Sequence, residues 1–105
     1  MDDELADLIP LFLGEARERL ARLYELLPQV GESPPALLAA RRELHTLEGS
    51  SRMLGFAAMA TLCREGQTLL ADESSIPTEQ VAGLLDRVRE ALDAVAPASS
   101  PEHAS

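Results

Sequence analysis

Residues 33–55 are SPPALLAARRELHTLEGSSRMLG, a stretch that carries both the start and the stop signals of one amphipathic helix. Ser33 is a good N-cap, and the prolines after it suit the first helical positions, which need no backbone N–H. Gly55 suits the position just after a helix end. The pattern predicts a helix over residues 35–54 with apolar or small residues every three or four positions: Leu37, Ala40, Leu44, Leu47, Ser51 and Leu54.

Three further helices are predicted around this stretch, over residues 3–27, 56–71 and 77–95, by the same spacing. Pro10 interrupts the first of them, so residues 3–9 form either a short separate helix or a bend. The expected inward positions are Leu5, Leu8, Phe12, Ala16, Leu20, Leu23 and Leu27, then Phe56, Met59, Leu62, Cys63, Gly66, Leu69 and Leu70, and finally Val81, Leu84, Val88, Leu92 and Val95.

Four amphipathic helices with short connections predict an all-α fold, an antiparallel four-helix bundle over residues 1–96. Residues 97–105 are rich in Pro, Ala and Ser and have no apolar stripe, so we expect a disordered, flexible C-terminal linker. The length of 105 residues allows one domain.

The composition excludes several classes of function. The net charge is -9, so phosphate backbones and anionic lipid surfaces would repel the chain, and we expect no nucleic-acid partner. No apolar run approaches the roughly 18 residues of a spanning helix, and the acidic start is no signal peptide, so we expect no membrane insertion and a cytoplasmic protein. One cysteine and two separated histidines argue against a structural metal site, and we expect none.

His45 lies on the other side of its helix from the apolar stripe. At 100° per residue it points about 130° from the centre of the stripe, so we expect it to face solvent. Gly49 follows one turn later on nearly the same face, where glycine costs about 1 kcal/mol relative to alanine but leaves one flank of the imidazole clear. Arg41 and Arg52, one turn before and two turns after, would bring positive charge to the ring.

An exposed imidazole with a clear flank and nearby guanidinium groups suits a group that becomes anionic. Neutral imidazole is a nucleophile near neutral pH, and a phosphoryl group on its ring nitrogen would pair well with arginine. Position alone nevertheless favours a plainer interpretation, an ordinary surface histidine beside a helix-packing glycine. The surrounding sequence favours the phosphoryl acceptor.

The sequence HTLEGSSRMLGF, residues 45–56, resembles the signature of histidine phosphotransfer (HPt) domains, most closely those at the N-terminus of chemotaxis-type histidine kinases. That signature has His, two residues, usually Lys, then Gly, two small residues and a second Gly before the third helix. The matching residues are His45, Gly49, Ser50, Ser51 and Gly55. FLGEA at residues 12–16 and LCRE at residues 62–65 also look similar to the family, so the resemblance covers about residues 3–95.

The resemblance implies that His45 accepts a phosphoryl group from the ATP-dependent domain of a histidine kinase. It would pass this group to an aspartate of a response-regulator receiver domain. The domain would have no cofactor of its own and no independent catalysis, because its partners would supply ATP and Mg²⁺. It would be the N-terminal part of a kinase or a free-standing shuttle. The docking face would add Leu38 and Arg42 to the exposed residues around His45.

Two positions depart from the family pattern. Glu48 stands where Lys is usual, and its charge would repel a phosphoryl group unless Arg52 pairs with it. We therefore expect Glu48→Lys to favour phosphorylation, unless a partner presents its own cation to Glu48. Gln67 stands where kinase-linked members commonly carry a Glu bonded to the ring, and its carbonyl would accept from the ring N–H.

Both departures support an alternative function, a degenerate HPt-like module that docks a kinase or receiver domain without carrying phosphate. A weaker alternative is a purely structural bundle that dimerises.

Overall fold

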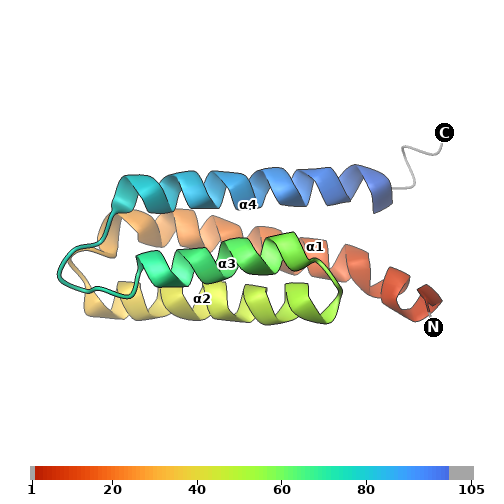
Figure 1. Cartoon of the computed structure of the whole chain (residues 1–105), viewed down its shortest axis with the longest axis horizontal. Coiled ribbons are helices and arrows are strands. Elements are labelled where there is room, and N and C mark those ends of the chain that lie inside the picture. Colours follow the sequence, from red (N-terminus) through yellow and green to blue (C-terminus); the bar gives the residue numbers. More distant parts are fainter. Residues whose placement is uncertain (1, 100–105) are drawn as a thin grey trace.

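The computed structural model describes residues 2–99, with side chains over residues 6–95, and in this range the chain forms four helices and one 3-10 turn. Their bounds are Asp2–Leu26 (α1), Leu27–Gln29 (η1), Pro34–Met53 (α2), Ala57–Leu69 (α3) and Thr78–Ser99 (α4). Consecutive helices run antiparallel, and α1 and α3 each pack on both α2 and α4 (Figure 1). The predicted all-α antiparallel four-helix bundle is confirmed.

Both ends of α2 follow the signals in the sequence. The Ser33 hydroxyl accepts a hydrogen bond from the backbone N–H of Ala36 at 3.3 Å. Gly55 has a positive φ of 85°, which a residue with a side chain rarely adopts. This turn lets Gly55 N–H donate to the Arg52 carbonyl and Phe56 N–H to the Ser51 carbonyl, which satisfies two carbonyls of the last helical turn.

The core occupies the space between the four helices and closely matches the predicted stripes. Leu44, Leu47, Cys63, Leu85, Val88 and Leu92 are almost completely buried. Gly66 permits the close approach of α3 to its two neighbours, because an added Cβ would lie 2.9 Å from a methyl group of Leu44 and 3.0 Å from one of Leu84. The helix that carries His45 is therefore held tightly against α3.

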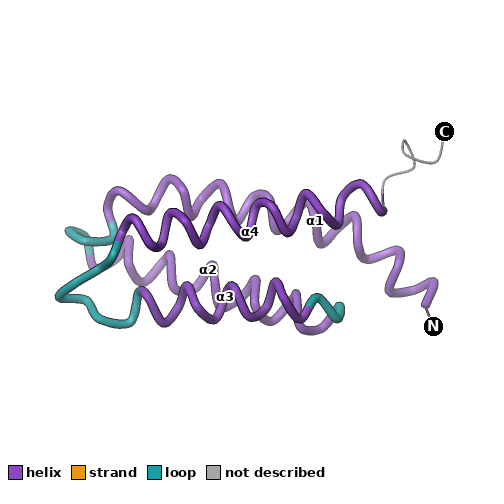
Figure 2. Tube along the Cα trace, turned by 45° about the horizontal axis from the view of Figure 1, so that its top comes forward, coloured by secondary structure: helices purple, strands orange, loops and turns teal. Residues whose placement is uncertain are grey.

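The N-terminal turns of α1 differ from the prediction at one core position. The helix is continuous through Pro10, and its first turns bend away from the axis of the rest (Figure 2). A bend is expected there, since proline cannot donate to the preceding turn. Leu8, predicted to be inward, is 43% exposed, because the helix bends in these turns, and it lines a surface depression with Met53 of α2. The side chain of Leu5 lies outside the described side chains.

The last helix is longer than the sequence predicted. α4 continues to Ser99, four residues beyond the predicted end at Val95, so residues 97–99 of the expected linker are helical. The apolar stripe ends at Val95, and the spacing gave no signal for these last residues. The remainder of the predicted linker, residues 100–105, lies outside the described residues.

Polar contacts at the helix interfaces join the bundle from outside the core. The Tyr24 hydroxyl of α1 donates to a carboxylate oxygen of Asp86 in α4 at 2.5 Å. Glu43 of α2 accepts from both Arg19 and Arg22 of α1. Over the residues described, none of the helices combines the length and the apolar character needed to cross a bilayer.

Candidate functional site

His45 lies in the middle of α2 with its ring exposed, as the helical spacing predicted. Within the described part of the chain the ring has no hydrogen-bond or ion-pair partner. Gly49, one turn later, is also exposed, and a Cβ added there would meet no atom within 4 Å. The imidazole is therefore free to act as a nucleophile and open to an incoming group on the Gly49 side.

The ring borders a surface depression between α2 and α3. The residues that line this depression are His45, Glu48, Gly49, Arg52, Arg64, Gln67, Thr68 and Ala71. Four of the predicted site residues besides His45 thus meet in one place: Glu48, Gly49, Arg52 and Gln67. We call this the His45 depression. Within the side chains described, no three His, Cys, Asp or Glu residues are grouped as they would be around a metal ion.

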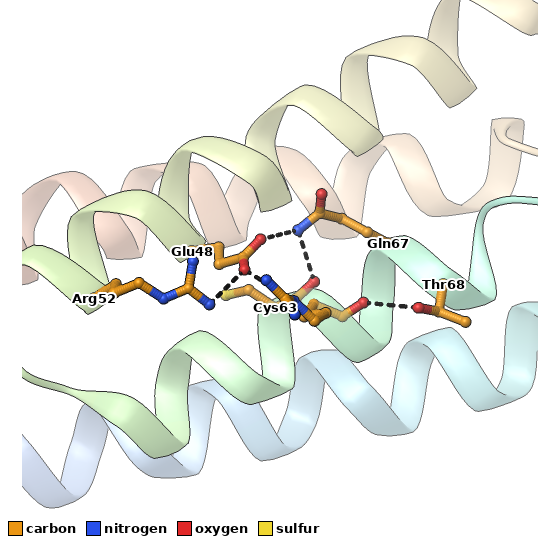
Figure 3. A network of polar contacts seen from close by, with 6 residues as sticks. Glu48, Arg52, Cys63, Gln67 and Thr68 are labelled. Atoms are coloured by element: carbon orange, nitrogen blue, oxygen red, sulfur yellow. Dashed lines mark hydrogen bonds and ion pairs between the residues drawn. The ribbon is translucent and has the colours of Figure 1, made fainter.

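The Glu48 side chain is not the free surface charge that its spacing from His45 suggested. It is only 7% exposed, and its carboxylate accepts from three side chains. Arg52 donates to Oε2 at 2.8 Å, Arg64 donates to the same oxygen at 3.2 Å, and Gln67 donates to Oε1 at 2.7 Å (Figure 3). Its charge is therefore masked, by the Arg52 pairing that the sequence left open and by Arg64 as well.

These contacts also fix the charge of Glu48. The hydrogen bond from Gln67, with those from Arg52 and Arg64, lowers the pKa of the Glu48 carboxyl below its ordinary value, although burial opposes the shift. The carboxyl is ionised at neutral pH. The neighbouring Cys63 thiol is held neutral, because burial and the Glu48 charge raise its pKa to about 12.

Gln67 does not make the contact that was expected of it. Its amide nitrogen donates to Glu48 and to the Cys63 carbonyl at 3.2 Å, and no hydrogen bond joins it to the ring of His45. The amide lies in the His45 depression but acts on Glu48, across the gap between α3 and α2 (Figure 3). Its role in the described structure is to hold the carboxylate.

Arg41 is not available to His45 either. Its guanidinium donates to the Leu70 carbonyl at 2.7 and 2.9 Å and to the Ala71 carbonyl at 3.0 Å. These carbonyls follow the last turn of α3, where a helix leaves acceptors unpaired and favours a cation. The expectation that Arg41 flanks the ring is wrong, because the C-terminus of α3 competes for its charge.

The predicted docking face around His45 is exposed. Leu38 and Arg42 both lie on the open side of α2, and Arg42 has no ion-pair partner within the described residues. Sequence reasoning missed Met53, which is 75% exposed on the same helix. Met53 lines a second, apolar depression with Leu8 and Leu11 of α1. Because the apolar spacing placed Leu8 in the core, the sequence did not predict this exposed apolar depression.

Arg64 is the principal residue that sequence reasoning missed. It lies on α3, nineteen positions away from His45 in the chain, and it enters the His45 depression only because α3 packs antiparallel on α2. A helical wheel of α2 contains no signal for it. The family-like segment at residues 62–65 marked its position without assigning it a role.

Comparison with known proteins agrees with this geometry. A family model described as the Hpt domain matches residues 7–98, which include all of α2 and α3, most of α1 and α4, and the whole His45 depression. No solved structure was found to match the chain. Since the family match spans most of the 105 residues, the chain belongs to the Hpt domain family and takes part in two-component phosphotransfer.

Proposed function

We propose that His45 accepts a phosphoryl group from the ATP-binding domain of a histidine kinase and passes it to an aspartate of a receiver domain. One observation carries the proposal: in a chain of the Hpt family, the ring of His45 is exposed, unpartnered and open on its Gly49 flank. A donor can approach such a ring without any rearrangement of the bundle. Since ATP is the phosphoryl source, the proposal puts the domain in the cytoplasm.

The transfer in this proposal takes two steps. The lone pair of a neutral ring nitrogen attacks the terminal phosphorus of ATP, an N–P bond forms, and the P–O bond to ADP breaks. The other ring nitrogen then gives up its proton to solvent. In the second step a carboxylate oxygen of the receiver attacks the phosphorus, the N–P bond breaks, and its electron pair returns to the ring nitrogen. The ring takes back one proton from solvent, so His45 leaves as neutral imidazole. Mg²⁺ belongs to the partner domains in both steps.

The exposed face of α2 is the docking surface in this proposal. Leu38 and Met53 offer apolar contact, and Arg42 offers a charge that no described residue neutralises. Resemblance to the kinase-linked members supports a kinase as the donor. Apolar contacts surrounded by a polar rim are typical of protein–protein interfaces.

A labelling experiment with two matched variants tests the proposal. The domain is incubated with the ATP-binding domain of a histidine kinase and radiolabelled ATP, and label that survives alkali but not acid is counted. The chain has two histidines, so His103→Gln is the natural control for His45→Gln. We expect wild type and His103→Gln to carry acid-labile label and His45→Gln to carry none. Because the residue is exposed, His45→Gln should change the unfolding free energy by less than about 0.5 kcal/mol.

Two results would overturn the proposal. Acid-labile label on His45→Gln would assign the phosphoryl group elsewhere. Absence of label from wild type, together with retained binding to a receiver domain, would establish the alternative, an HPt-like docking module that carries no phosphate.

A further inference from the structure

The cluster around Glu48 carries more positive than negative charge. One ionised carboxylate pairs with two guanidinium groups, so Glu48, Arg52 and Arg64 together have a formal surplus of one positive charge. This surplus lies in the His45 depression of a chain whose net charge is -9. A phosphoryl group on a ring nitrogen brings two negative charges near neutral pH, and it would find its counter-charge there.

The hydrogen bonds of the three nearby arginines show that, within the described residues, Arg64 alone among them keeps both terminal nitrogens unpaired. Arg41 donates to backbone carbonyls after α3. Arg52 donates to Glu48 through a terminal nitrogen, Nη2. Arg64 donates through Nε, the nitrogen closest to its aliphatic stem, and its two terminal nitrogens have no partner in the described residues. Its side chain is 68% exposed.

This arrangement suits recognition of a phosphoryl group. A guanidinium binds phosphoryl oxygens best with two parallel N–H groups, and the unused terminal nitrogens of Arg64 can supply them. The Nε bond to Glu48 fixes the guanidinium at its base, so less side-chain freedom is lost when the phosphoryl group arrives. Gln67 in turn fixes Glu48 through Oε1.

We propose that Arg64 binds the oxygens of the phosphoryl group on His45, and that Glu48, anchored by Gln67, positions Arg64 for this contact. The inference rests on the proposed function of His45. It gives Glu48 a role opposite to the one that the sequence suggested: Glu48 is a positioning residue instead of a repelling charge. The cation that related domains carry three residues after the histidine comes here from α3.

Labelling by phosphoramidate tests this contact without a partner protein. The ring nitrogen of His45 forms the N–P bond, the P–N bond of protonated phosphoramidate breaks, and ammonia leaves. The variants are Arg64→Ala, Arg64→Lys and, as the matched control, Arg22→Ala. Arg22 is also an exposed arginine that donates through Nε to a glutamate of α2, but its partner is Glu43, and it does not line the His45 depression.

We expect Arg64→Ala to slow labelling and to shorten the lifetime of the phosphohistidine, each about tenfold, and Arg64→Lys to restore part of both. Arg22→Ala, with the same change in net charge, should stay within about twofold of wild type. The ³¹P resonance of the phosphohistidine should shift in Arg64→Ala and not in Arg22→Ala. If Arg64 acted only on folding, the ³¹P resonance would not shift in Arg64→Ala, and Arg64→Lys would not restore labelling.

The possible outcomes separate this inference from the function on which it rests. If wild type is labelled at His45 and Arg64→Ala behaves like Arg22→Ala, the function stands and the role of Arg64 is disproved. If wild type is not labelled at His45, both fall. Circular dichroism controls for folding, and Arg64→Gln, which keeps the stem and one amide donor, replaces the alanine variant if that variant unfolds.

Discussion

Glu43 and Glu48 of α2, five residues apart, each bind two arginines, but the two pairs of contacts lie on different sides of the helix. Glu43 accepts from Arg19 and Arg22 of α1, and Glu48 accepts from Arg52 and Arg64. Both side chains are mostly buried, at 17% and 7% exposure. The Glu43 cluster faces α1 and ties two helices together, whereas the Glu48 cluster faces α3 and shares a depression with His45.

The comparison shows that a buried carboxylate between two guanidinium groups does not by itself indicate function. At Glu43 the Arg22 guanidinium reaches both carboxylate oxygens, at 3.0 and 3.5 Å, and uses a terminal nitrogen in doing so. At Glu48 the terminal nitrogens of Arg64 remain unused. Arg22 thus binds Glu43 through two nitrogens, whereas Arg64 binds Glu48 through Nε alone and keeps both terminal nitrogens for another group.

The largest effect is expected from charge reversal at either glutamate. Glu48→Lys puts a third cation beside Arg52 and Arg64, and Glu43→Lys does the same beside Arg19 and Arg22. We expect each to lower the unfolding free energy by on the order of 3 kcal/mol, because both guanidinium groups lose a largely buried partner. Urea unfolding followed by circular dichroism measures the loss.

This expectation replaces the gain in phosphorylation that the sequence suggested for Glu48→Lys. A Glu48→Lys domain that is as stable as wild type and takes up phosphoryl groups faster would restore the earlier interpretation. It would also show that the Glu48 cluster does not hold the two arginines.

A smaller effect, with a characteristic pH dependence, is expected for the neutral variants. Burial would raise the pKa of Glu43, but hydrogen bonds from Arg22 and Arg19 outweigh it, so the pKa values of both glutamates are lowered. Their contribution to stability is complete above about pH 4.3, the ordinary glutamate pKa, and is lost as the pH falls through the lower folded pKa. Glu43→Gln and Glu48→Gln should each cost about 1–2 kcal/mol at pH 7.

Thermal unfolding from pH 7 down to pH 2 measures this difference. The stability gap between wild type and each variant should narrow as the pH falls below about 4. A gap that stays constant would show that the carboxylate charge contributes nothing. Only Glu48→Gln should also change the rate of labelling by phosphoramidate, and an equal change in Glu43→Gln would remove the distinction between the two clusters.

The smallest effect on stability is expected at Gly49, which leaves one flank of the His45 ring open and has no counterpart in the Glu43 cluster. Gly49→Ala should stabilise the domain by up to about 1 kcal/mol through helix propensity and leave phosphotransfer intact. Gly49→Leu should block transfer to a receiver domain by placing bulk beside the ring. Gly83 on α4 is a matched control, because it is exposed and equally open to an added Cβ. Transfer by Gly49→Leu at the rate of Gly83→Leu would show that clearance is not the role of Gly49.

The sequence was a good guide wherever one helix decides the outcome. Exposure of His45, the Ser33 cap, the turn at Gly55 and most core positions all follow from spacing within a single helix. It failed where two helices compete for a side chain. Arg41 donates to a carbonyl after the end of α3, Gln67 donates to Glu48, and Arg64 of α3 lines the His45 depression. A wheel drawn for α2 cannot represent partners that only the packing of α3 supplies.

The Tyr24–Asp86 contact gives the molecule an internal optical reporter. The chain has one tyrosine and no tryptophan, so its near-ultraviolet absorption and emission come mainly from Tyr24. That residue lies at the α1–α4 contact, whereas the His45 depression lies between α2 and α3. Burial and the hydrogen bond to Asp86 raise the pKa of Tyr24 to about 12, so tyrosinate absorption in milder alkali records opening of the α1–α4 contact. Opening of the α1–α4 contact can therefore be followed by ultraviolet absorption alone, independently of whether His45 carries a phosphoryl group.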